Sequence, residues 1–285
     1  MAAVSESGSL SVVATPIGNL EDMSPRAARC LAEVDLILAE DTRHSARLLD
    51  HLGVSNRVQA LHEHNEKQQL ERVLALLQQG QHIALICDAG TPLISDPGFQ
   101  LVRAAREAGV AVTSIPGPCA AVVALSLAGL PTDRFVFEGF PPAKRQARLN
   151  YLESLAAEAR TLVFYESPHR IIESLRAMAS VFGGERRAVV ARELTKAFES
   201  VYDDTLGVLP ETLSEDSNAR KGEFVVVVEG APDVGDAEHA TVVVAELLAR
   251  LVEEMPTKKA ARLVADLTGH SRNALYQQAL AMRSE

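Results

Sequence analysis

The chain has 285 residues, of which 47% are hydrophobic and 23% are charged. This balance is typical of an ordinary globular protein, and the length predicts two domains with a small appendage. The formal net charge of −10 argues against a general nucleic-acid binder, because an acidic surface repels a polyanion.

Further classes of protein are excluded by the cysteines and by the apolar runs. Cys30, Cys87 and Cys119 lie at wide, irregular spacing, which is neither a disulfide framework nor a zinc pattern and suits a reducing compartment. No uncharged apolar run has the length of a membrane span. The first residues lack the basic and apolar regions of a signal peptide, so we expect a cytoplasmic protein without membrane contact.

Strands and helices alternate through the first half of the chain. The apolar runs at residues 10–15, 35–39, 83–87 and 110–115 predict strands, and helical spacing of apolar residues follows them. Ser24-Pro25 is a helix start, with a capping hydroxyl and a proline at the first helical position. This alternation predicts an α/β domain over residues 10–132, with a mostly parallel sheet covered on both faces.

The stretch from Ile83 to Gly98 is the most informative part of this half. Its strand breaks into Asp88-Ala89-Gly90-Thr91-Pro92, where small residues allow a bound molecule to approach the backbone. Ligands of open α/β sheets bind at the carboxyl ends of the strands, so we expect a ligand here. An ordinary strand-to-helix loop explains these residues equally well when they are considered alone.

A second α/β domain is predicted over residues 133–232. It begins at Phe135 and continues through a linker or hinge at residues 139–142 and a polar, basic helix at 143–159. Strands are expected at residues 161–165, 188–191, 199–202 and 223–228, with more mixed pairing than in the first domain.

The pattern from residue 238 to 285 is purely helical. The turn Thr268-Gly269-His270-Ser271 has the length and the glycine of a helix-turn-helix, which predicts a C-terminal helical domain. Such units are as often packing motifs as nucleic-acid contacts. Basic residues here and in the helix at 143–159 are the predicted RNA contacts: Lys144, Arg145, Arg148, Lys258, Lys259 and Arg272.

Two common nucleotide motifs are absent, and a different set is present. No Gly-x-Gly-x-x-Gly follows the first strand and no Walker sequence occurs, which argues against a nicotinamide cofactor and a P-loop. The chain instead contains Thr15-Pro-Ile-Gly-Asn-Leu20, Ala39-Glu-Asp-Thr-Arg43, His62-Glu-His-Asn-Glu66, Asp88-Ala-Gly-Thr-Pro92, Pro116-Gly-Pro-Cys-Ala-Ala121 and Phe164-Tyr-Glu-Ser-Pro-His-Arg170. Taken in order, this set resembles the tetrapyrrole-methylase-like superfamily and, within it, the 16S rRNA cytidine 2′-O-methyltransferases.

The resemblance implies a fold, a reaction and a set of site residues. It implies two α/β domains with S-adenosylmethionine in the cleft between them, usually in a homodimer, and methylation of a decoding-centre cytidine of 16S rRNA on the small ribosomal subunit. The cofactor positions that it implies, together with the rest of the 88–91 loop, are Ile17, Asp88, Ala89, Gly90, Thr91, Ile94, Cys119, Ala120, Tyr165, Glu166 and Leu194.

Two departures from the superfamily pattern bear on the substrate. Relatives that act on tetrapyrroles usually carry Asp where this chain has Thr91, and a Gly-rich turn where it has Thr15-Pro16-Ile17. Both departures argue against a porphyrin substrate.

Methylation of a ribose hydroxyl needs a group that orients the hydroxyl or accepts its proton, because the hydroxyl is a poor nucleophile at neutral pH. Charged clusters follow several predicted strands; each alone is explained by an ion-paired loop, but together they lie where ligands bind. We predict Asp41 and Arg43 around the acceptor nucleotide and Glu166 near the cofactor.

Two other groups invite a chemical role that we do not expect. His62 and His64 lie two residues apart, but no further ligand has metal-like spacing, so no metal is predicted. Cys119 has no histidine nearby in the sequence and is expected to pack against a ligand rather than act as a nucleophile.

Two alternative functions remain open. The chain could be a non-catalytic RNA-binding assembly factor with an unused cofactor cleft, or a methyltransferase that acts on a tetrapyrrole or another small molecule. The helical C-terminal part and the basic helix at 143–148 argue against the small molecule, which needs neither.

Overall fold

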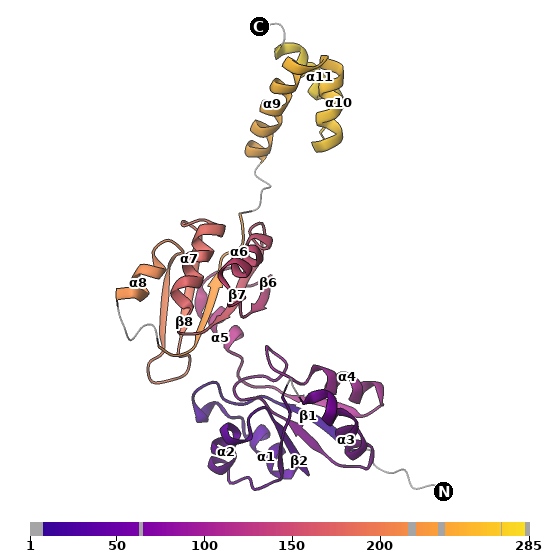
Figure 1. The fold of residues 1–285 in the computed structure, drawn as a ribbon, viewed down its shortest axis with the longest axis vertical. Helices are drawn as coiled ribbons and strands as arrows, with labels where there is room; N and C mark the ends of the chain where they lie inside the picture. Colours follow the sequence, from indigo (N-terminus) through magenta and orange to yellow (C-terminus); the bar gives the residue numbers. More distant parts are fainter. Residues whose placement is uncertain (1–7, 63–64, 216–220, 233–236, 269, 283–285) are drawn as a thin grey trace. The chain divides into compact units, whose positions relative to one another are not determined.

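The computed structural model describes residues 8–62, 65–215, 221–232, 237–268 and 270–282 (Figure 1). The described residues up to Ala231 form one compact unit, and those from Pro232 onward form a second. The first unit contains two five-stranded sheets, and the second is helical.

The first sheet is parallel throughout, with strand order β3-β2-β4-β1-β5. Its strands are β1 (Ser9–Val13), β2 (Leu36–Ala39), β3 (Val58–Ala60), β4 (Ile83–Leu85) and β5 (Ala111–Ile115). The helices between them are α1 (Pro25–Glu33), α2 (Thr42–His51), α3 (Glu66–Gln78) and α4 (Phe99–Glu107), and the short 3₁₀ helix η1 (Leu20–Asp22) precedes α1.

Both faces of this sheet are buried, which is why its strands are apolar without alternation. Leu36 and Leu38 of β2 pack with residues of α3 and α4, whereas Ile37 and Ala39 pack with residues of α1 and α2. The predicted start of α1 is confirmed, because the Ser24 hydroxyl accepts a hydrogen bond from the Ala27 amide at 3.1 Å.

The second sheet has strand order β6-β7-β10-β8-β9. Its strands are β6 (Phe135–Gly139), β7 (Thr161–Glu166), β8 (Arg187–Arg192), β9 (Ser200–Thr205) and β10 (Phe224–Val228). Only β6 and β7 pair in parallel, and the other pairs are antiparallel, as the mixed pattern predicts. One face packs against α6 (Arg145–Ser154), α7 (Ile171–Phe182) and α8 (Leu209–Glu215).

The other face of the second sheet is covered by α5 (Ala120–Ala128), although this helix precedes the sheet in the chain. Ala121, Ala124 and Leu125 pack against apolar residues of β7, β8 and β10. The helix just before residue 132 thus contributes to the core of the second sheet. The predicted domain boundary at that residue therefore stays a prediction.

The second unit consists of α9 (Ala237–Glu254), α10 (Thr257–Thr268) and α11 (Arg272–Met282). Leu248, Ala260, Val264 and Leu275 form its buried core. Gly269, the glycine of the predicted turn, lies outside the described residues. Across the part of the chain that the structure describes, no helix combines the length and apolarity needed to cross a membrane.

The predicted fold class, two α/β sheets followed by a helical C-terminal part, is confirmed. Several elements differ from the expectation, among them β9, which ends at Thr205 rather than at residue 202. The basic helix is shorter than residues 143–159, because α6 ends at Ser154, and α8 was not predicted.

Candidate functional site

A cavity of about 380 Å³ lies in the first unit among the loops that follow the strands. This volume lies within the range of small-molecule sites, roughly 300–1,000 Å³. Residues of the first sheet's loops that line it are Ile17, Asp88, Ala89, Gly90, Thr91, Ile94, Ser95 and Asp96. The other lining residues follow β5 or lie in the strands and loops of the second sheet. They are Cys119, Ala120, Phe140, Tyr165, Glu166, Ser167, Pro168, Ala191, Leu194, Glu223, Phe224 and Val225.

Every residue that the sequence predicted for the cofactor lines this one cavity. They are Ile17, Asp88, Ala89, Gly90, Thr91, Ile94, Cys119, Ala120, Tyr165, Glu166 and Leu194. Ser95, Asp96, Phe140 and Glu223 were missed, among others. The turn Asp96-Pro97-Gly98 was a usable signal for Asp96. Glu223 belongs to no motif and is held at the cavity just before β10 by hydrogen bonds with Glu193.

The loop after β4 is held open toward the cavity by its backbone. Gly90 and Thr15 form an isolated antiparallel bridge, with the Thr15 amide donating to the Gly90 carbonyl at 2.8 Å. Gly90 has a φ of +86°, which other residues rarely adopt. The Thr91 hydroxyl donates to the carbonyl of Pro118 at 2.9 Å, which ties this loop to the loop after β5.

Backbone strain concentrates beside two of the predicted cofactor residues. The non-glycine residues with positive φ in the described chain are Leu93 and Ser95, which flank Ile94, and Glu193 and Thr195, which flank Leu194. Such conformations cost on the order of 1–3 kcal/mol each and cluster at functional sites. Ile94 and Leu194 are therefore presented to the cavity by two strained loops.

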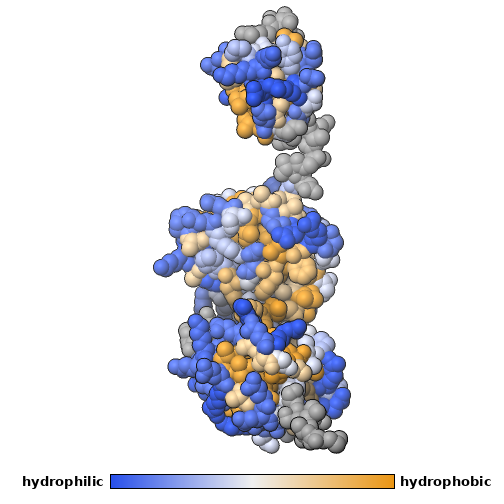
Figure 2. Space-filling view, turned by 90° about the vertical axis from the view of Figure 1, so that its right-hand side faces the viewer, coloured by the Kyte–Doolittle hydropathy of each residue, from blue (hydrophilic) through white to orange (hydrophobic). Residues whose placement is uncertain are grey.

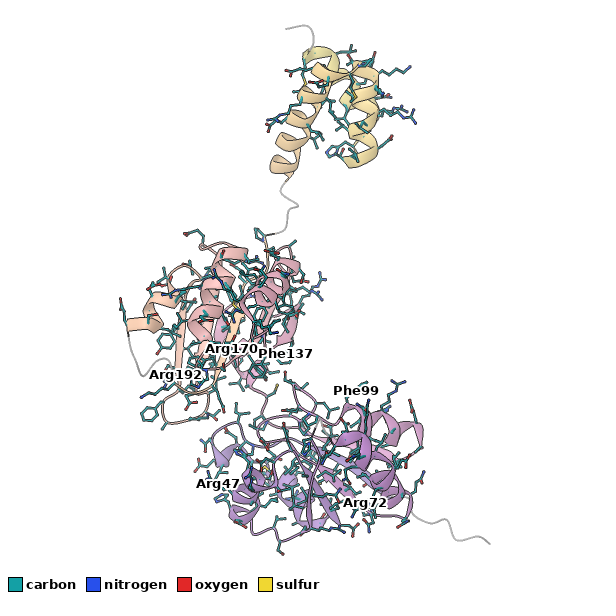
Figure 3. The ribbon with its side chains drawn as sticks, in the orientation of Figure 1. Arg47, Arg72, Phe99, Phe137, Arg170 and Arg192 are labelled. Atoms are coloured by element: carbon teal, nitrogen blue, oxygen red, sulfur yellow. The ribbon has the colours of Figure 1, made fainter. Side chains whose placement is uncertain are left out.

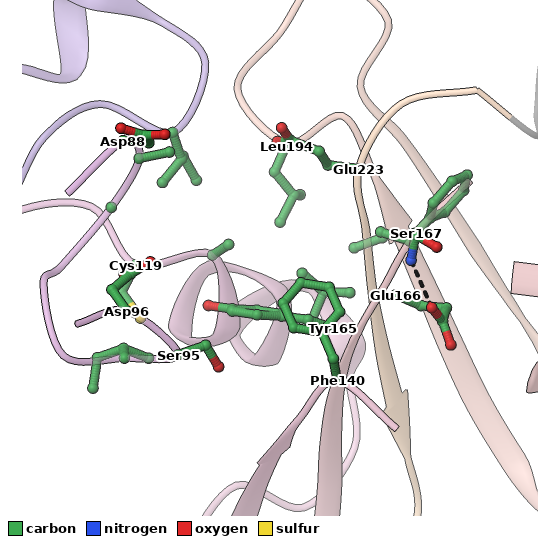
Figure 4. Close-up of a pocket in the computed structure, with 18 of the residues that line it drawn as sticks. Asp88, Ser95, Asp96, Cys119, Phe140, Tyr165, Glu166, Ser167, Leu194 and Glu223 are labelled. Carbon is green, nitrogen blue, oxygen red and sulfur yellow. Dashed lines mark hydrogen bonds between the residues drawn. The ribbon is translucent and has the colours of Figure 1, made fainter. Parts of the chain in front are cut away.

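Two aromatic rings form part of the wall (Figure 4). Tyr165 lies with its ring centroid 5.5 Å from that of Phe140 and 4.9 Å from that of Phe137, in edge-on geometry. The Tyr165 hydroxyl accepts a hydrogen bond from the Ala121 amide at 3.2 Å, at the start of α5. Burial raises the pKa of Tyr165 far above the neutral range, so its hydroxyl stays protonated.

Carboxylates gather on the side of the first sheet. The Asp88 carboxylate accepts a hydrogen bond from the Asp41 amide at 3.0 Å. Burial, with the nearby charge of Asp88, raises the pKa of Glu40, and burial raises the pKa of Asp96 to about 6. Asp88 and Asp96 line the cavity on this side, and their carboxyl groups suit a positively charged ligand.

Because the pKa of Asp96 is raised in the folded protein, its carboxyl group should lower the free energy of unfolding by an amount that depends on pH. Its folded value of about 6 lies above the ordinary 3.8, so the native state binds a proton that the unfolded chain releases, and stability falls as pH rises from about 4 to 6. Asn cannot ionise, so Asp96→Asn should have a higher melting temperature than the wild type at pH 7.5. Thermal scans from pH 4 to 8 should show the difference vanish near pH 4; a pH-independent difference would contradict the pKa.

Glu166 lines the cavity, but its carboxylate is committed elsewhere. The side chain is fully buried, pairs with Arg170 at 2.7 Å and accepts hydrogen bonds from the Ser167 amide at 2.7 Å and the Ser174 hydroxyl. Strand alternation directs Tyr165 to the α5 face of the sheet and Glu166 to the opposite face. Through these contacts Glu166 holds the loop at residues 167–170. A catalytic role for Glu166 near the cofactor stays a prediction.

Asp41 and Arg43 lie outside the residues that line this cavity. The Asp41 carboxylate caps α2 by accepting from the Arg43 amide at 2.8 Å, and it pairs with the Arg43 guanidinium at 3.2 Å. The Arg43 side chain is 90% exposed. The capping role explains Asp41 in physical terms, and contact of either residue with an acceptor nucleotide stays a prediction.

The predicted RNA contacts divide into exposed and buried residues. Arg148 is only 2% exposed and donates to Glu173 at 3.1 Å and to the Ala143 carbonyl, which corrects the expectation that it contacts RNA. The remaining five are exposed, so RNA contact stays a prediction for Lys144, Arg145, Lys258, Lys259 and Arg272.

The histidine pair is only partly described, because His64 lies outside the described residues. Among the residues that are described, no group of three His, Cys, Asp or Glu side chains could hold a metal ion. Glu66, which follows this pair, is buried and accepts a hydrogen bond from the Leu101 amide at 3.0 Å, at the start of α4.

Comparison with known proteins agrees with this architecture. The family model of the tetrapyrrole (corrin/porphyrin) methylases matches residues 9–210, and the model described as the RsmI C-terminal HTH domain matches residues 238–283. Curated relatives called ribosomal RNA small subunit methyltransferase I are 54% identical in Pseudomonas aeruginosa and 52% in Haemophilus influenzae; each match covers 96% of this chain and 97% of the relative. The chain therefore belongs to the tetrapyrrole methylase family and, within it, to the ribosomal RNA small subunit methyltransferase I proteins.

Solved structures share the fold at low sequence identity. Diphthine synthase aligns with a TM-score of 0.61 at 17% identity, over 78% of this chain and 90% of that one. Uroporphyrin-III-C-methyltransferase from Thermus thermophilus aligns with a TM-score of 0.54 at 21% identity, over 77% and 94% of the two chains.

Proposed function

We propose that the chain transfers a methyl group from S-adenosylmethionine to the ribose 2′-oxygen of a decoding-centre cytidine in 16S rRNA, on the small ribosomal subunit. The observation that carries the proposal is the convergence of all the predicted cofactor residues, from segments far apart in the sequence, on one cavity. Family membership supplies the methyl-transfer chemistry.

The residues of the cavity fit S-adenosylmethionine. Ala191, Leu194 and Val225 offer an apolar wall for the adenine, and Asp88 and Asp96 offer carboxylates to its positive charges. Gly90 and Ala89 leave the backbone of the β4 loop open to close approach. When bound, S-adenosylmethionine supplies a methyl group activated by its sulfonium, and the protein supplies alignment and exclusion of water.

RNA as the acceptor is supported by the relatives and by surface charge. The curated relatives are named for the small-subunit rRNA. The exposed lysines and arginines of α6, α10 and α11 give an otherwise acidic chain local sites for phosphate, which suits recognition of a folded RNA by shape.

A homodimer in the cytoplasm completes the proposal. Figure 2 shows apolar surface over the part of the first unit that contains the second sheet. Val122 and Leu127 of α5 and Phe135 of β6 are exposed apolar side chains of the kind that a partner subunit covers. Sedimentation of the purified chain tests the dimer directly.

The test of the function is transfer of tritium from methyl-labelled S-adenosylmethionine. Unmethylated small ribosomal subunits, free 16S rRNA and a porphyrin precursor serve as parallel acceptors. We expect label in the RNA, mapped to a ribose 2′-oxygen of cytidine. Label in the porphyrin would establish the small-molecule alternative, and measurable donor binding with no label in any acceptor would favour the assembly-factor alternative.

A further inference from the structure

A second cavity, of about 460 Å³, adjoins the first. The two share Ile17, Asp88, Ala89 and Glu223 as wall residues. The rest of the second cavity is lined by Thr15, Pro16, Gly18, Leu20, His44, Ser45, Arg47, Leu48, Cys87 and Lys196. Whatever occupies it therefore lies next to the occupant of the first cavity.

The second cavity carries positive charge that the first lacks. Arg47 is exposed on α2 and forms none of the ion pairs or hydrogen bonds found among the described residues. Lys196 contributes a second cation, which Glu193 and Glu223 hold at 2.9 Å and 3.0 Å. The Ser45 hydroxyl is buried and has no hydrogen-bond partner within the described part of the chain. An exposed guanidinium without a partner in a cavity wall suits an anionic ligand, such as a phosphate group.

Lys196, which lies between β8 and β9 of the second sheet, packs closely against Gly18 in the turn after β1. A Cβ atom on Gly18 would lie 2.4 Å from Cγ of Lys196, so the absence of a side chain at residue 18 lets the lysine stem cross the turn. Both Gly18 and Lys196 line the second cavity.

Asp88 is the ionisable side chain of the shared wall that forms no ion pair among the described residues; one of its carboxylate oxygens accepts a hydrogen bond from the Asp41 amide. Glu223, the other ionisable residue of that wall, pairs with Lys196. His44 lines the second cavity only. A carboxylate at the junction of two cavities can contact groups in both.

We propose that the second cavity binds the acceptor nucleotide, with Arg47 on a backbone phosphate and Asp88 on the ribose hydroxyl that is methylated. This inference rests on the proposed function. The ribose oxygen forms its bond to the methyl carbon as the carbon–sulfur bond breaks, the electron pair of that bond stays on sulfur, and Asp88 accepts the hydroxyl proton. Arg47 thereby joins Arg43 as an arginine of α2 that is expected to contact the RNA.

The test of Arg47 compares two variants with the same change of charge. Arg47→Gln removes the cation of the cavity, and Arg72→Gln removes an exposed cation of α3 that lines neither cavity (Figure 3). We expect Arg47→Gln to raise KM for small subunits about tenfold and to reduce the slope of log KM against log salt by about 0.7–0.9, the value for one phosphate contact. Donor affinity, measured by calorimetry, should stay at the wild-type value in both variants, which also shows that both fold.

Asp88→Asn tests the role of the shared carboxylate. We expect kcat, measured at saturating donor because Asp88 also lines the first cavity, to fall by about 100- to 10,000-fold. KM for the small subunit should change by no more than about threefold. Suppose that the wild-type chain methylates RNA. A wild-type salt slope for Arg47→Gln, or a wild-type kcat for Asp88→Asn, would then overturn this inference but not the proposed function. A wild-type chain that labels no RNA would overturn the proposed function and this inference with it.

Discussion

Gly90→Val should lower the affinity for S-adenosylmethionine by about 100-fold or more. An added Cβ atom would lie 3.3 Å from Cγ2 of Ile17, inside the wall of the first cavity, and overpacking costs about 1–3 kcal/mol. The φ of +86° adds strain of roughly 1–2 kcal/mol, which the loop can relieve only by breaking the bridge to Thr15. Each 1.4 kcal/mol is about tenfold in affinity, and calorimetric titration measures the change.

Gly109→Val is the matched control for backbone strain. Gly109 has a φ of +74°, and an added Cβ atom would meet no atom within 4 Å. This variant should lose stability but keep the wild-type affinity for the donor. Equal donor affinity in the two variants would show that the β4 loop does not form the donor site.

Glu166→Ala should lower the free energy of unfolding by about 3–5 kcal/mol. The change leaves the guanidinium of Arg170, whose side chain is 23% exposed, without the carboxylate that it contacts at 2.7 Å, and unpaired buried charges are costly. The Ser174 hydroxyl and the Ser167 amide lose the same acceptor. Denaturant unfolding followed by circular dichroism measures the loss.

Two comparisons make this prediction specific. Glu211→Ala removes an ion pair with Arg176 in which both side chains are more than half exposed, and it should cost less than about 1 kcal/mol. Glu166→Gln keeps hydrogen-bonding capacity and should cost less than Glu166→Ala. If Glu166→Ala and Glu211→Ala are equally stable, the buried carboxylate does not hold the loop at residues 167–170.

The sequence was most informative where local chemistry decides the structure. The cap at Ser24, the apolar runs of β2 and β4 and the small residues after β4 each act within a few residues, so the fold class and the cofactor segments followed from them. The resemblance then joined segments that no local rule connects.

The remaining site residues depend on contacts that no local pattern encodes. The charged residues of the Glu40–His44 segment look equivalent in the sequence, but Asp41 turns back to cap α2. Glu166 and Tyr165 both line the cavity, yet the alternation of β7 directs the Glu166 carboxylate to Arg170 and Ser174 on the opposite face of the sheet. Arg148 appears as part of a basic cluster, and the sequence does not show that it is buried with contacts to the Ala143 carbonyl and to Glu173 of α7.

The position of α5 has a consequence for how the chain can be divided. A fragment that begins at residue 133 would contain every strand of the second sheet but lack the helix that shields one face of it. Val163, Val189 and Val227, each at most 1% exposed in the intact chain, would then face water. Such a fragment would tend to aggregate, whereas one that also includes residues 118–132 would keep its core covered. The smallest piece able to fold around the second sheet therefore starts inside the first half of the sequence.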